Sequence, residues 1–270
     1  MPIQIKTEEE IRAMKISGKI LAEALEESCR FAKPGMSTLE LDTFAENLIR
    51  KNNAIPAFKG YRGFPATLCT CLNKVIVHGI PKKDEIMQEG DLLTIDCGVI
   101  YEGMYTDAAR SMIIGVPPRR DSYLLAAPSA PPVGKSLNNK RNRLIKTAYE
   151  ALNKITDILK PGLHLNEIGK TIQKIVEDAG FHIVKDLTGH GIGHRLHEEP
   201  IILNYWDGTP GPILKPGMTL AIEPIFAAGT GKMRLSSDKW TLITTDNSDA
   251  VQVENTFLIT ENGNEVLTEL

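Results

Sequence analysis

Cysteine is scarce in this sequence and forms no pattern that would support a disulfide framework. Only four cysteines occur in 270 residues, and none of them forms a C-x-x-C pair. Cys69 and Cys71 form a C-x-C pair, but no second cysteine cluster accompanies it. The sequence therefore predicts reduced, mostly buried thiols and argues against a cysteine-based metal site.

Long apolar runs and a strong excess of one charge are also missing. Residues 1–10 contain no apolar core of a targeting signal, and no apolar run approaches the roughly 18 residues of a membrane-spanning helix. The net charge is −3, so the composition does not indicate binding to a membrane or to nucleic acid. We therefore expect a cytoplasmic protein. Its 42% hydrophobic residues can form a sizeable core, in one large domain or two small ones.

Two capping boxes begin the first two predicted helices. In each, a threonine or serine precedes a glutamate by three residues, at Thr7–Glu10 and at Ser37–Glu40. The first helix is expected to continue through Phe31 and to stop at Lys33-Pro34-Gly35. Further along, the pattern predicts strands around residues 69–72 and 75–77, and helices over residues 143–159 and 167–179.

The second half of the chain repeats the order of the first. Lys33-Pro34-Gly35 returns 127 positions later as Lys160-Pro161-Gly162, and Leu93-Thr94-Ile95-Asp96 returns at the same offset as Leu220-Ala221-Ile222-Glu223. Each unit reads helix, Pro-Gly stop, helix, strands and finally a strand that carries a carboxylate. This internal duplication predicts two units packed about a local dyad, with Asp96 and Glu223 meeting at the centre.

The segment of residues 92–110 predicts a hairpin with one buried face. Apolar and polar residues alternate along its first strand, and Glu102-Gly103 supplies a turn. If the hairpin folds about the midpoint between Tyr101 and Glu102, Asp96 and Asp107 lie directly opposite each other. Two facing carboxylates about 4.5–5.5 Å apart at Cβ repel each other, so they need a shared proton or a shared cation. We expect a cation.

A later segment, residues 189–200, is rich in glycine and histidine, with three of each. Glycines let the backbone approach a ligand closely, and each histidine alone would fit ordinary packing. One imidazole together with four carboxylates, however, is an oxygen-rich set that suits two divalent ions better than a lone tetrahedral zinc. Two ions about 3.5–4 Å apart activate water and stabilise an oxyanion, so we predict metal-assisted hydrolysis. The four acids are Asp96, Asp107, Glu223 and Glu254.

Eight short motifs follow one another in an order and spacing typical of one enzyme family. With them, the sequence resembles the type I methionine aminopeptidases over nearly its whole length. The resemblance implies an α+β pita-bread fold, a pseudo-two-fold repeat of helix-helix-strand units around a central antiparallel sheet. It also implies removal of the initiator methionine from nascent proteins with a small second residue. The motifs are His78-Gly79-Ile80-Pro81, Thr94-Ile95-Asp96, Thr106-Asp107, Thr188-Gly189-His190-Gly191-Ile192-Gly193, His197-Glu198-Glu199-Pro200, Lys215-Pro216-Gly217-Met218-Thr219, Ile222-Glu223-Pro224 and Glu254-Asn255-Thr256.

The resemblance assigns a role to each candidate site residue. Asp107 and Glu254 would bridge two divalent ions, and Mn, Fe, Co and Zn all tolerate such a ligand set. Glu223 would also act as the general base. His197 would hydrogen-bond the scissile carbonyl as charge builds on its oxygen, and His78 would contact the substrate amide. The full implied ligand set is Asp96, Asp107, His190, Glu223 and Glu254.

The resemblance also implies a pocket for the methionine side chain, although ordinary core packing would explain the same residues. Three features depart from the family pattern. Asn255 stands where a histidine often follows the last ligand, and Arg195 and Leu196 replace small and aromatic residues before His197. The link between the halves is also longer than usual, but no departure removes a ligand. The implied pocket residues are Tyr61, Phe64, Cys69, Leu196 and Trp240.

Two other functions remain open. An Xaa-Pro aminopeptidase or prolidase would keep this fold, but such relatives usually carry an N-terminal domain, and only 77 residues precede His78. A catalytically silent pita-bread module that binds proteins or nucleic acid would generally lose metal ligands, and all five implied ligands are present. We therefore expect the N-terminal peptides of nascent proteins as partners, with no membrane and no sequence-specific nucleic acid.

We expect one catalytic domain, residues 1–270, that consists of two halves, residues 1–116 and 144–270. A proline-rich basic segment, residues 117–143, separates the halves. It carries five prolines, six basic residues and a single acid. A solvated surface loop is the simpler interpretation. The alternative is a weak ribosome contact, in which the basic residues touch RNA phosphates. These residues are Arg119, Arg120, Lys135, Lys140, Arg141 and Arg143.

Overall fold

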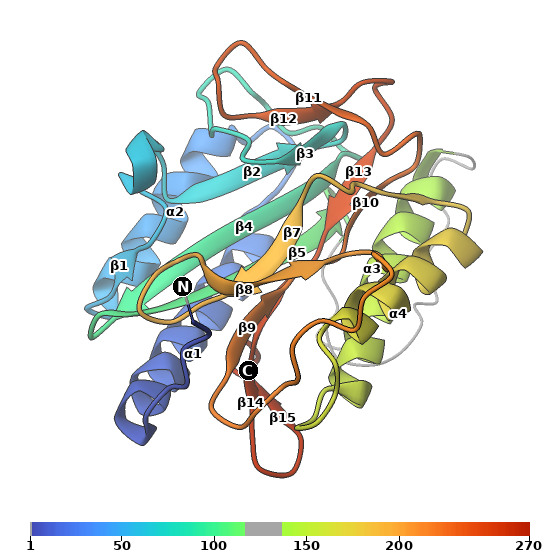
Figure 1. Ribbon diagram of the computed structural model, residues 1–270. Coiled ribbons are helices and arrows are strands. Elements are labelled where there is room, and N and C mark those ends of the chain that lie inside the picture. The colour runs from blue at the N-terminus through green and yellow to red at the C-terminus, as the bar shows by residue number, and fades with distance from the viewer. Residues whose placement is uncertain (1, 117–136) are drawn as a thin grey trace.

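Four helices in the described part of the chain pack against one side of the central strands (Figure 1). The computed structural model describes residues 2–116 and 137–270. Helix α1 (Glu8–Phe31) lies against β4 (Leu92–Tyr101) and β5 (Met104–Ile113), and α2 (Thr38–Lys51) lies against α1, β1 (Ile55–Pro56) and β2 (Leu68–Leu72). Helices α3 (Leu137–Ile158) and α4 (Asn166–Asp178) pack against each other; α3 also contacts β5 and β13 (Ala250–Gln252), and α4 contacts β6 (His182–Ile183) and β8 (Glu198–Leu203). None of the helices in the described residues combines the length and the apolar content that a membrane span requires.

Both predicted capping boxes are confirmed. The Thr7 hydroxyl accepts from the Glu10 backbone N–H, and the Glu10 carboxylate accepts from the Thr7 N–H. Ser37 and Glu40 form the same pair of bonds at the start of α2. These reciprocal bonds satisfy backbone donors that the first helical turn leaves unpaired, which fixes where each helix begins.

The strands form two larger groups and two smaller ones. In the first half, β4 pairs with β5 along one edge, and with β2 and then β1 along its other edge. In the second half, one sheet has the order β15-β14-β9-β7-β8 and a smaller one has the order β13-β10-β6. The sheet β11-β12-β3 joins two strands of the second half to one of the first. The bounds are β1 Ile55–Pro56, β2 Leu68–Leu72, β3 Val75–Val77, β4 Leu92–Tyr101, β5 Met104–Ile113, β6 His182–Ile183, β7 Thr188–Gly191, β8 Glu198–Leu203, β9 Thr219–Ile222, β10 Ile225–Ala227, β11 Met233–Leu235, β12 Leu242–Thr244, β13 Ala250–Gln252, β14 Asn255–Ile259 and β15 Asn264–Val266. A single 3₁₀ turn, Tyr61–Gly63, lies among the described residues between β1 and β2.

The hairpin of β4 and β5 forms as predicted, but its predicted register is wrong. Asp96 pairs with Ala109, and Asp107 pairs with Gly98, because the turn is centred between Glu102 and Gly103. Both turn residues have positive φ, 48° and 79°, as a two-residue hairpin turn demands. Asp96 and Asp107 are therefore diagonal neighbours on one face of the hairpin rather than direct partners.

The two halves meet at the edge of β5. Ala109 and Glu254 form an antiparallel bridge, with each backbone N–H donating to the carbonyl oxygen of the other at 3.2 and 3.0 Å. The order of elements repeats across this junction: two helices precede β2, β4 and β5 in the first half and β7, β9 and β14 in the second. This arrangement is the predicted pseudo-two-fold repeat.

The long segment between the halves is not a loop throughout. Helix α3 begins at Leu137, seven residues inside the predicted loop 117–143, while residues 117–136 lie outside the described part of the chain. Arg141 is buried, and its guanidinium contacts both carboxylate oxygens of Asp249 at 3.0 Å. Its place among the phosphate-binding residues is therefore a wrong prediction, because the side chain already neutralises an acid of the second half.

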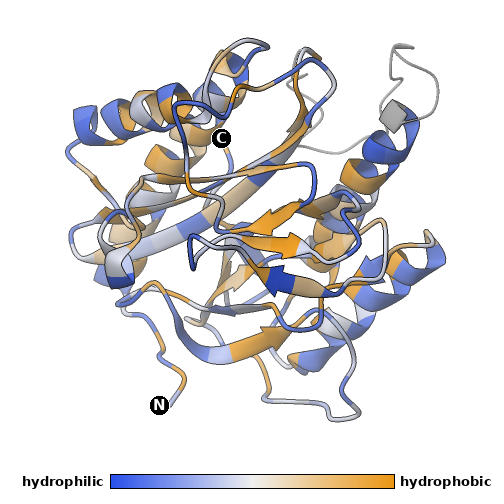
Figure 2. Ribbon diagram, turned by 90° about the horizontal axis from the view of Figure 1, so that it is seen from above, coloured by the Kyte–Doolittle hydropathy of each residue, from blue (hydrophilic) through white to orange (hydrophobic). Residues whose placement is uncertain are grey.

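The apolar core is shared between the halves. Figure 2 shows helices striped with hydrophilic and hydrophobic turns and several mainly hydrophobic strands between them. Leu93, Ile95 and Cys97 of β4 face α1 and α2, so the alternation of the strand turns Asp96 toward the other side. One cluster joins Leu92 to α3 and α4, and another joins Met14 of α1 to Ile192. Packing thus holds the carboxylate-bearing faces of both halves against each other.

Candidate metal centre

Five candidate ligands converge from five different strand segments. Their residues lie on β4 and β5 of the first half, on β7, directly after β9, and directly before β14 of the second half. All five are at most 9% exposed. Each candidate ligand thus lies on a strand or directly next to one, so the site is built into the junction of the halves. The five are Asp96, Asp107, His190, Glu223 and Glu254.

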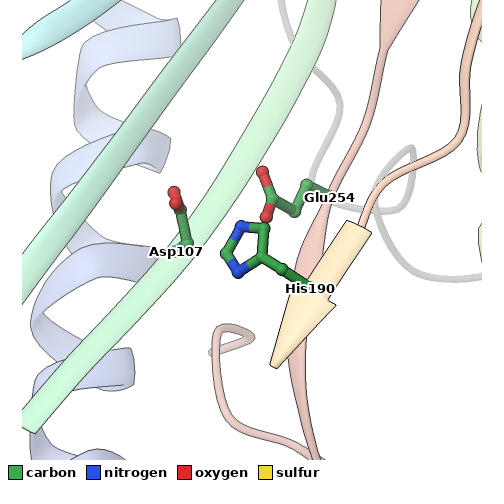
Figure 3. A group of neighbouring side chains, drawn as sticks. All are labelled: Asp107, His190 and Glu254. Atoms are coloured by element: carbon green, nitrogen blue, oxygen red, sulfur yellow. The ribbon is translucent and has the colours of Figure 1, made fainter. Parts of the chain in front are cut away.

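Three of the five candidate ligands lie close enough to share one ion. One side-chain ligand atom each from Asp107, His190 and Glu254 lies within 4.8 Å of the others, and Figure 3 shows these three side chains next to one another. Glu223 extends the group, because its Oε1 lies 3.8 Å from His190 Nε2. Asp96 is the diagonal neighbour of Asp107 on the same face of the hairpin.

Burial shifts the pKa of every group in the cluster away from its charged form. It raises the pKa of Asp96 to about 7 and raises the pKa of Asp107 well above its usual range, with the Asp96 charge adding to the effect. Burial and neighbouring carboxylates likewise raise the pKa of Glu223 and of Glu254. Burial lowers the pKa of His190 to about 4, so this imidazole is neutral at pH 7. Four buried carboxylates can all ionise only beside cations.

The donor atoms fit divalent metal ions. Asp96 Oδ1, Asp107 Oδ1 and Glu254 Oε1 are buried and have no hydrogen-bond partner among the described residues. A buried carboxylate oxygen without a partner costs free energy unless a cation or a proton satisfies it. Oxygen-rich donors with one neutral imidazole suit hard or borderline divalent ions.

Gln252 belongs to this cluster, and the sequence interpretation missed it. Its Nε2 donates to Glu223 Oε2 at 3.0 Å and lies 3.5 Å from Glu254 Oε2. The side chain is 2% exposed, and its Oε1 has no partner among the described residues. Its position two residues before Glu254 was an available signal, because alternate residues of an extended segment share a face. Gln252 holds one oxygen of Glu223 in place.

Two glycines allow the backbone to close around His190. A Cβ on Gly189 would lie 2.5 Å from the Ala221 oxygen, and a Cβ on Gly191 would lie 2.1 Å from the Glu199 oxygen. Both values are far below ordinary contact distances. Glycine on each side of His190 is thus a packing requirement of strand β7, in agreement with the expected close backbone approach.

His78 and His197 flank the cluster on its open side. The ring centroid of His197 lies 4.4 Å from that of His190, and its Nδ1 lies 2.9 Å from the Tyr61 hydroxyl. Part of the His197 side chain is open to solvent, yet the surrounding protein lowers its pKa, and the neighbouring imidazole of His190 adds to this. Burial also lowers the pKa of His78. Both imidazoles are therefore neutral hydrogen-bonding groups at pH 7.

The five predicted pocket residues lie together in one apolar cluster beside these histidines. Trp240 contacts Phe64 edge-on at a centroid distance of 5.2 Å and lies 6.4 Å from the His78 ring. Cys69 is 3% exposed and pairs across β2 and β4 with Asp96. Leu196 is 2% exposed, whereas Tyr61 and Trp240 are only partly buried. The apolar cluster therefore extends from the carboxylates toward the surface.

The residues that depart from the family pattern lie around the centre and displace no candidate ligand. Asn255 is buried, donates to Glu269 Oε1 at 3.1 Å and accepts from the Thr268 hydroxyl at 2.9 Å. It therefore ties the segment after Glu254 to the C-terminal residues. Arg195 is exposed, and Leu196 packs into the apolar cluster.

Comparison with known proteins agrees with this geometry. Residues 12–261 match metallopeptidase family M24, and the chain belongs to this family. It is 41% identical over 266 residues to a methionine aminopeptidase of Clostridium acetobutylicum, with 98% of each chain covered. It superposes on a methionine aminopeptidase of Thermotoga maritima with a TM-score of 0.89 and 37% identity over the whole of both chains. Against a prolidase of Pyrococcus furiosus the TM-score is 0.74 and the identity 25%, over 98% of this chain and 65% of the prolidase.

The expected fold and enzyme class are thus confirmed. The architecture is the pita-bread fold shared by these aminopeptidases and prolidases, and the chain is a metal-dependent hydrolase.

Proposed function

We propose that this protein removes the N-terminal methionine from nascent chains whose second residue is small. Two divalent ions would be held by the four carboxylates and His190, with Asp107 and Glu254 shared between them. The convergence of buried, partnerless carboxylate oxygens from both halves is the observation that carries the proposal. When bound, such ions supply an activated water and a positive charge beside the developing oxyanion.

Glu223 is the residue best placed to move the proton. Gln252 Nε2 donates to Oε2 of Glu223, while Oε1 of Glu223 faces His190. In the proposed reaction, the carboxylate takes a proton from water as the water oxygen attacks the carbonyl carbon. The carbon–nitrogen bond then breaks, and the proton passes to the leaving amine. The free base carboxylate is restored at the end of the cycle.

His197 and His78 would orient the peptide. When the Tyr61 hydroxyl donates to Nδ1 of His197, the proton of the neutral imidazole sits on Nε2, where it can donate to the scissile carbonyl oxygen. That hydrogen bond strengthens as negative charge develops on the oxygen, so it lowers the barrier rather than only aiding binding. His78 lies against Trp240 and would contact the amide beside the leaving group.

The apolar cluster beside the histidines would hold the methionine side chain. Phe64, Cys69 and Leu196 are buried, and Trp240 lies at its edge. An unbranched thioether fits such a mixed aromatic and aliphatic surface well. Tyr61 would complete this pocket where its ring lies against His197, at a centroid distance of 5.5 Å.

Peptide hydrolysis by the metal-stripped protein tests the proposal. Mn, Fe, Co and Zn are added back singly, with Met-Ala-Ser and an Xaa-Pro peptide as substrates. We expect cleavage of Met-Ala-Ser and a metal stoichiometry that approaches two. Cleavage of the Xaa-Pro peptide alone would favour a prolidase, and no cleavage with any metal would contradict the proposal.

A second arm tests the ligand assignment. Asp107→Asn should reduce turnover to below a few per cent of wild type, because the shared carboxylate is lost to both ions. Asp157→Asn is the matched control, since its side chain is 65% exposed on α3 and lies far from β5 in sequence. Equal activity of the two variants would overturn the role of Asp107.

We further propose a cytoplasmic location and a single catalytic domain over residues 1–270. We also infer that a weak ribosome contact involves the remaining basic residues of the segment 117–143, which are Arg119, Arg120, Lys135, Lys140 and Arg143. Because α3 begins at Leu137, the deletion that tests it should span residues 118–136. Unchanged ribosome co-sedimentation, independent of salt, would contradict the contact.

A further inference from the structure

The N-terminal segment before α1 inserts a lysine beneath the turn that carries His197. Lys6 Nζ lies 2.8 Å from Glu198 Oε2, and the two side chains are 1% and 6% exposed. The Lys6 backbone N–H donates to the Gly217 carbonyl oxygen at 2.8 Å, which fixes the segment beside the strands of the second half. Most other ion pairs among the described residues involve exposed side chains, so this buried pair calls for an explanation.

Glycine at position 193 makes room for this lysine. A Cβ on Gly193 would lie 2.0 Å from Lys6 Cε and 2.9 Å from Nζ, and Gly193 has a φ of +149°. The lysine stem therefore runs directly over the Gly193 backbone. Only glycine at position 193 leaves enough space for the Lys6 side chain at this place. A lysine exposed to solvent would not require such space.

The turn of residues 193–198 is closed mainly through Glu198. The Gly193 N–H donates to the Arg195 carbonyl oxygen at 3.2 Å, and the Arg195 N–H donates to Glu198 Oε1 at 2.9 Å. The Gly193 carbonyl oxygen accepts from the Tyr105 N–H at 2.7 Å, so the start of the turn is held by β5. At the other end, Glu198 begins strand β8 and pairs with Gly191, and its carboxylate ties the turn next to His197 to Arg195 and Lys6.

Two further polar side chains, His194 and Glu10, lie next to this pair. His194 lies across the turn, with its Nδ1 3.6 Å from Glu198 Oε1 and its Nε2 2.7 Å from Glu10 Oε1. Both contacts involve the 43% exposed His194 side chain, so solvent screens them. Lys6 is thus the buried cation that balances Glu198.

We propose that Lys6 is a positioning residue for His197. Through the Glu198 carboxylate, it would hold the turn of residues 193–198 in the geometry that presents the His197 ring to a substrate carbonyl. This inference rests on the proposed function of His197. Lys6 lies outside the helix-helix-strand units that repeat in the two halves, so it would be an addition of the N-terminal segment to the duplicated site.

Kinetics and NMR of Lys6→Met test this role, because methionine keeps the stem but removes the ammonium. We expect kcat on Met-Ala-Ser to fall at least tenfold, with KM within about twofold and with metal content unchanged. The ¹H–¹⁵N signals of the His197 ring, assigned with a His197→Asn variant, should shift. Lys6→Met/Glu198→Gln removes both charges while the amide oxygen still accepts from Arg195, so it should recover most of the lost kcat.

Lys15→Met is the matched control, since the Lys15–Glu265 pair is 46% and 42% exposed. If Lys6→Met matches this control in kcat and in the His197 signals, the proposal is wrong. Glu198→Asp provides a second route if Lys6→Met does not fold, because it keeps the charge but shortens the reach to Lys6 and Arg195. It should lower kcat and shift the same signals, and no change in either would refute the role. If wild type cleaves no methionyl peptide, the proposed function fails, while the ring signals still test the positioning.

Discussion

Asp107 and Thr256 are joined by a reciprocal pair of hydrogen bonds, although they lie 149 residues apart in the sequence. The Asp107 N–H donates to the Thr256 hydroxyl oxygen at 3.0 Å, and that hydroxyl donates to the Asp107 carbonyl oxygen at 2.7 Å. Thr256 is fully buried. The Thr256 side chain of one half thus satisfies the backbone N–H and carbonyl oxygen of Asp107 in the other half, as a neighbouring strand would otherwise do.

Replacing Thr256 with valine should weaken both the fold and the metal centre. Valine keeps the shape but leaves the Asp107 N–H and carbonyl oxygen unsatisfied, at a cost of about 3 kcal/mol. Urea unfolding of the metal-free protein and metal titration would measure the two effects. Thr43→Val is the control, because its exposed hydroxyl bonds only to Leu39 of the same helix. Equal stability of both variants would contradict the structural role of the pair.

The metal-free protein should lose stability as pH rises from about 6 to 8. Burial raises the pKa of Asp96 to about 7 in the folded state, and burial with neighbouring carboxylates raises the pKa values of Asp107, Glu223 and Glu254 well above their usual range. The contribution of these four carboxyl groups to the free energy of unfolding is complete below their unfolded-state pKa values near 4. It is lost as the pH rises through their folded-state pKa values. Melting temperatures in chelator at pH 6, 7 and 8 would show the slope.

The histidines oppose this trend only at lower pH. The lowered pKa of His190 gives stability that is complete above about 6.5 and is lost as pH falls toward 4. Added metal should remove the slope between pH 6 and 8, because it holds the carboxylates ionised. A slope that persists unchanged with saturating metal, or that Asp96→Asn leaves intact, would contradict this account.

Alanine at Gly191 should disrupt the strand that carries His190. The new Cβ would lie 2.1 Å from the Glu199 oxygen and 2.6 Å from its carbonyl carbon, both of them backbone atoms. We expect a loss of about 3 kcal/mol in unfolding free energy and weaker metal binding. Gly263→Ala is the control, because a Cβ there meets nothing within 4 Å, and its stability should stay within about 0.5 kcal/mol of wild type.

Replacing Arg141 with methionine should loosen the contact between the halves. Arg141 donates to the Gly90 carbonyl oxygen as well as to Asp249, so its loss leaves a largely buried carboxylate unpaired. We expect a cost of about 3 kcal/mol and one unfolding transition, as for a single domain. Lys146→Met, on the exposed side of the same helix, should change stability by less than about 0.5 kcal/mol. Two separate transitions in wild type would contradict the single domain.

Local patterns were predicted well because few residues decide them. The two capping boxes depend on side chains three positions apart, and the structure contains both. The repeat also succeeded, since it related Asp96 on β4 to Glu223 directly after β9 without any knowledge of packing. The apolar alternation of β4 likewise identified which face carries the carboxylates.

The misses have specific physical causes. The hairpin register failed because Glu102 adopts positive φ, a conformation that the sequence signals clearly only for asparagine, aspartate or glycine. Arg141 was placed in a basic surface segment because its acidic partner, Asp249, lies 108 residues away in the sequence. Lys6 was not singled out because its partner, Glu198, lies 192 residues away. Only the tertiary fold brings such partners together.

The reciprocal bonds between β5 and the segment after Glu254 also bear on how the chain folds. A contact over 149 residues requires the closure of a very long loop, which is slow compared with hairpin formation. The β4–β5 hairpin can form early, but the ligand set is complete only when this last closure occurs. Metal uptake during refolding should therefore report the final step of folding and lag behind the recovery of secondary structure.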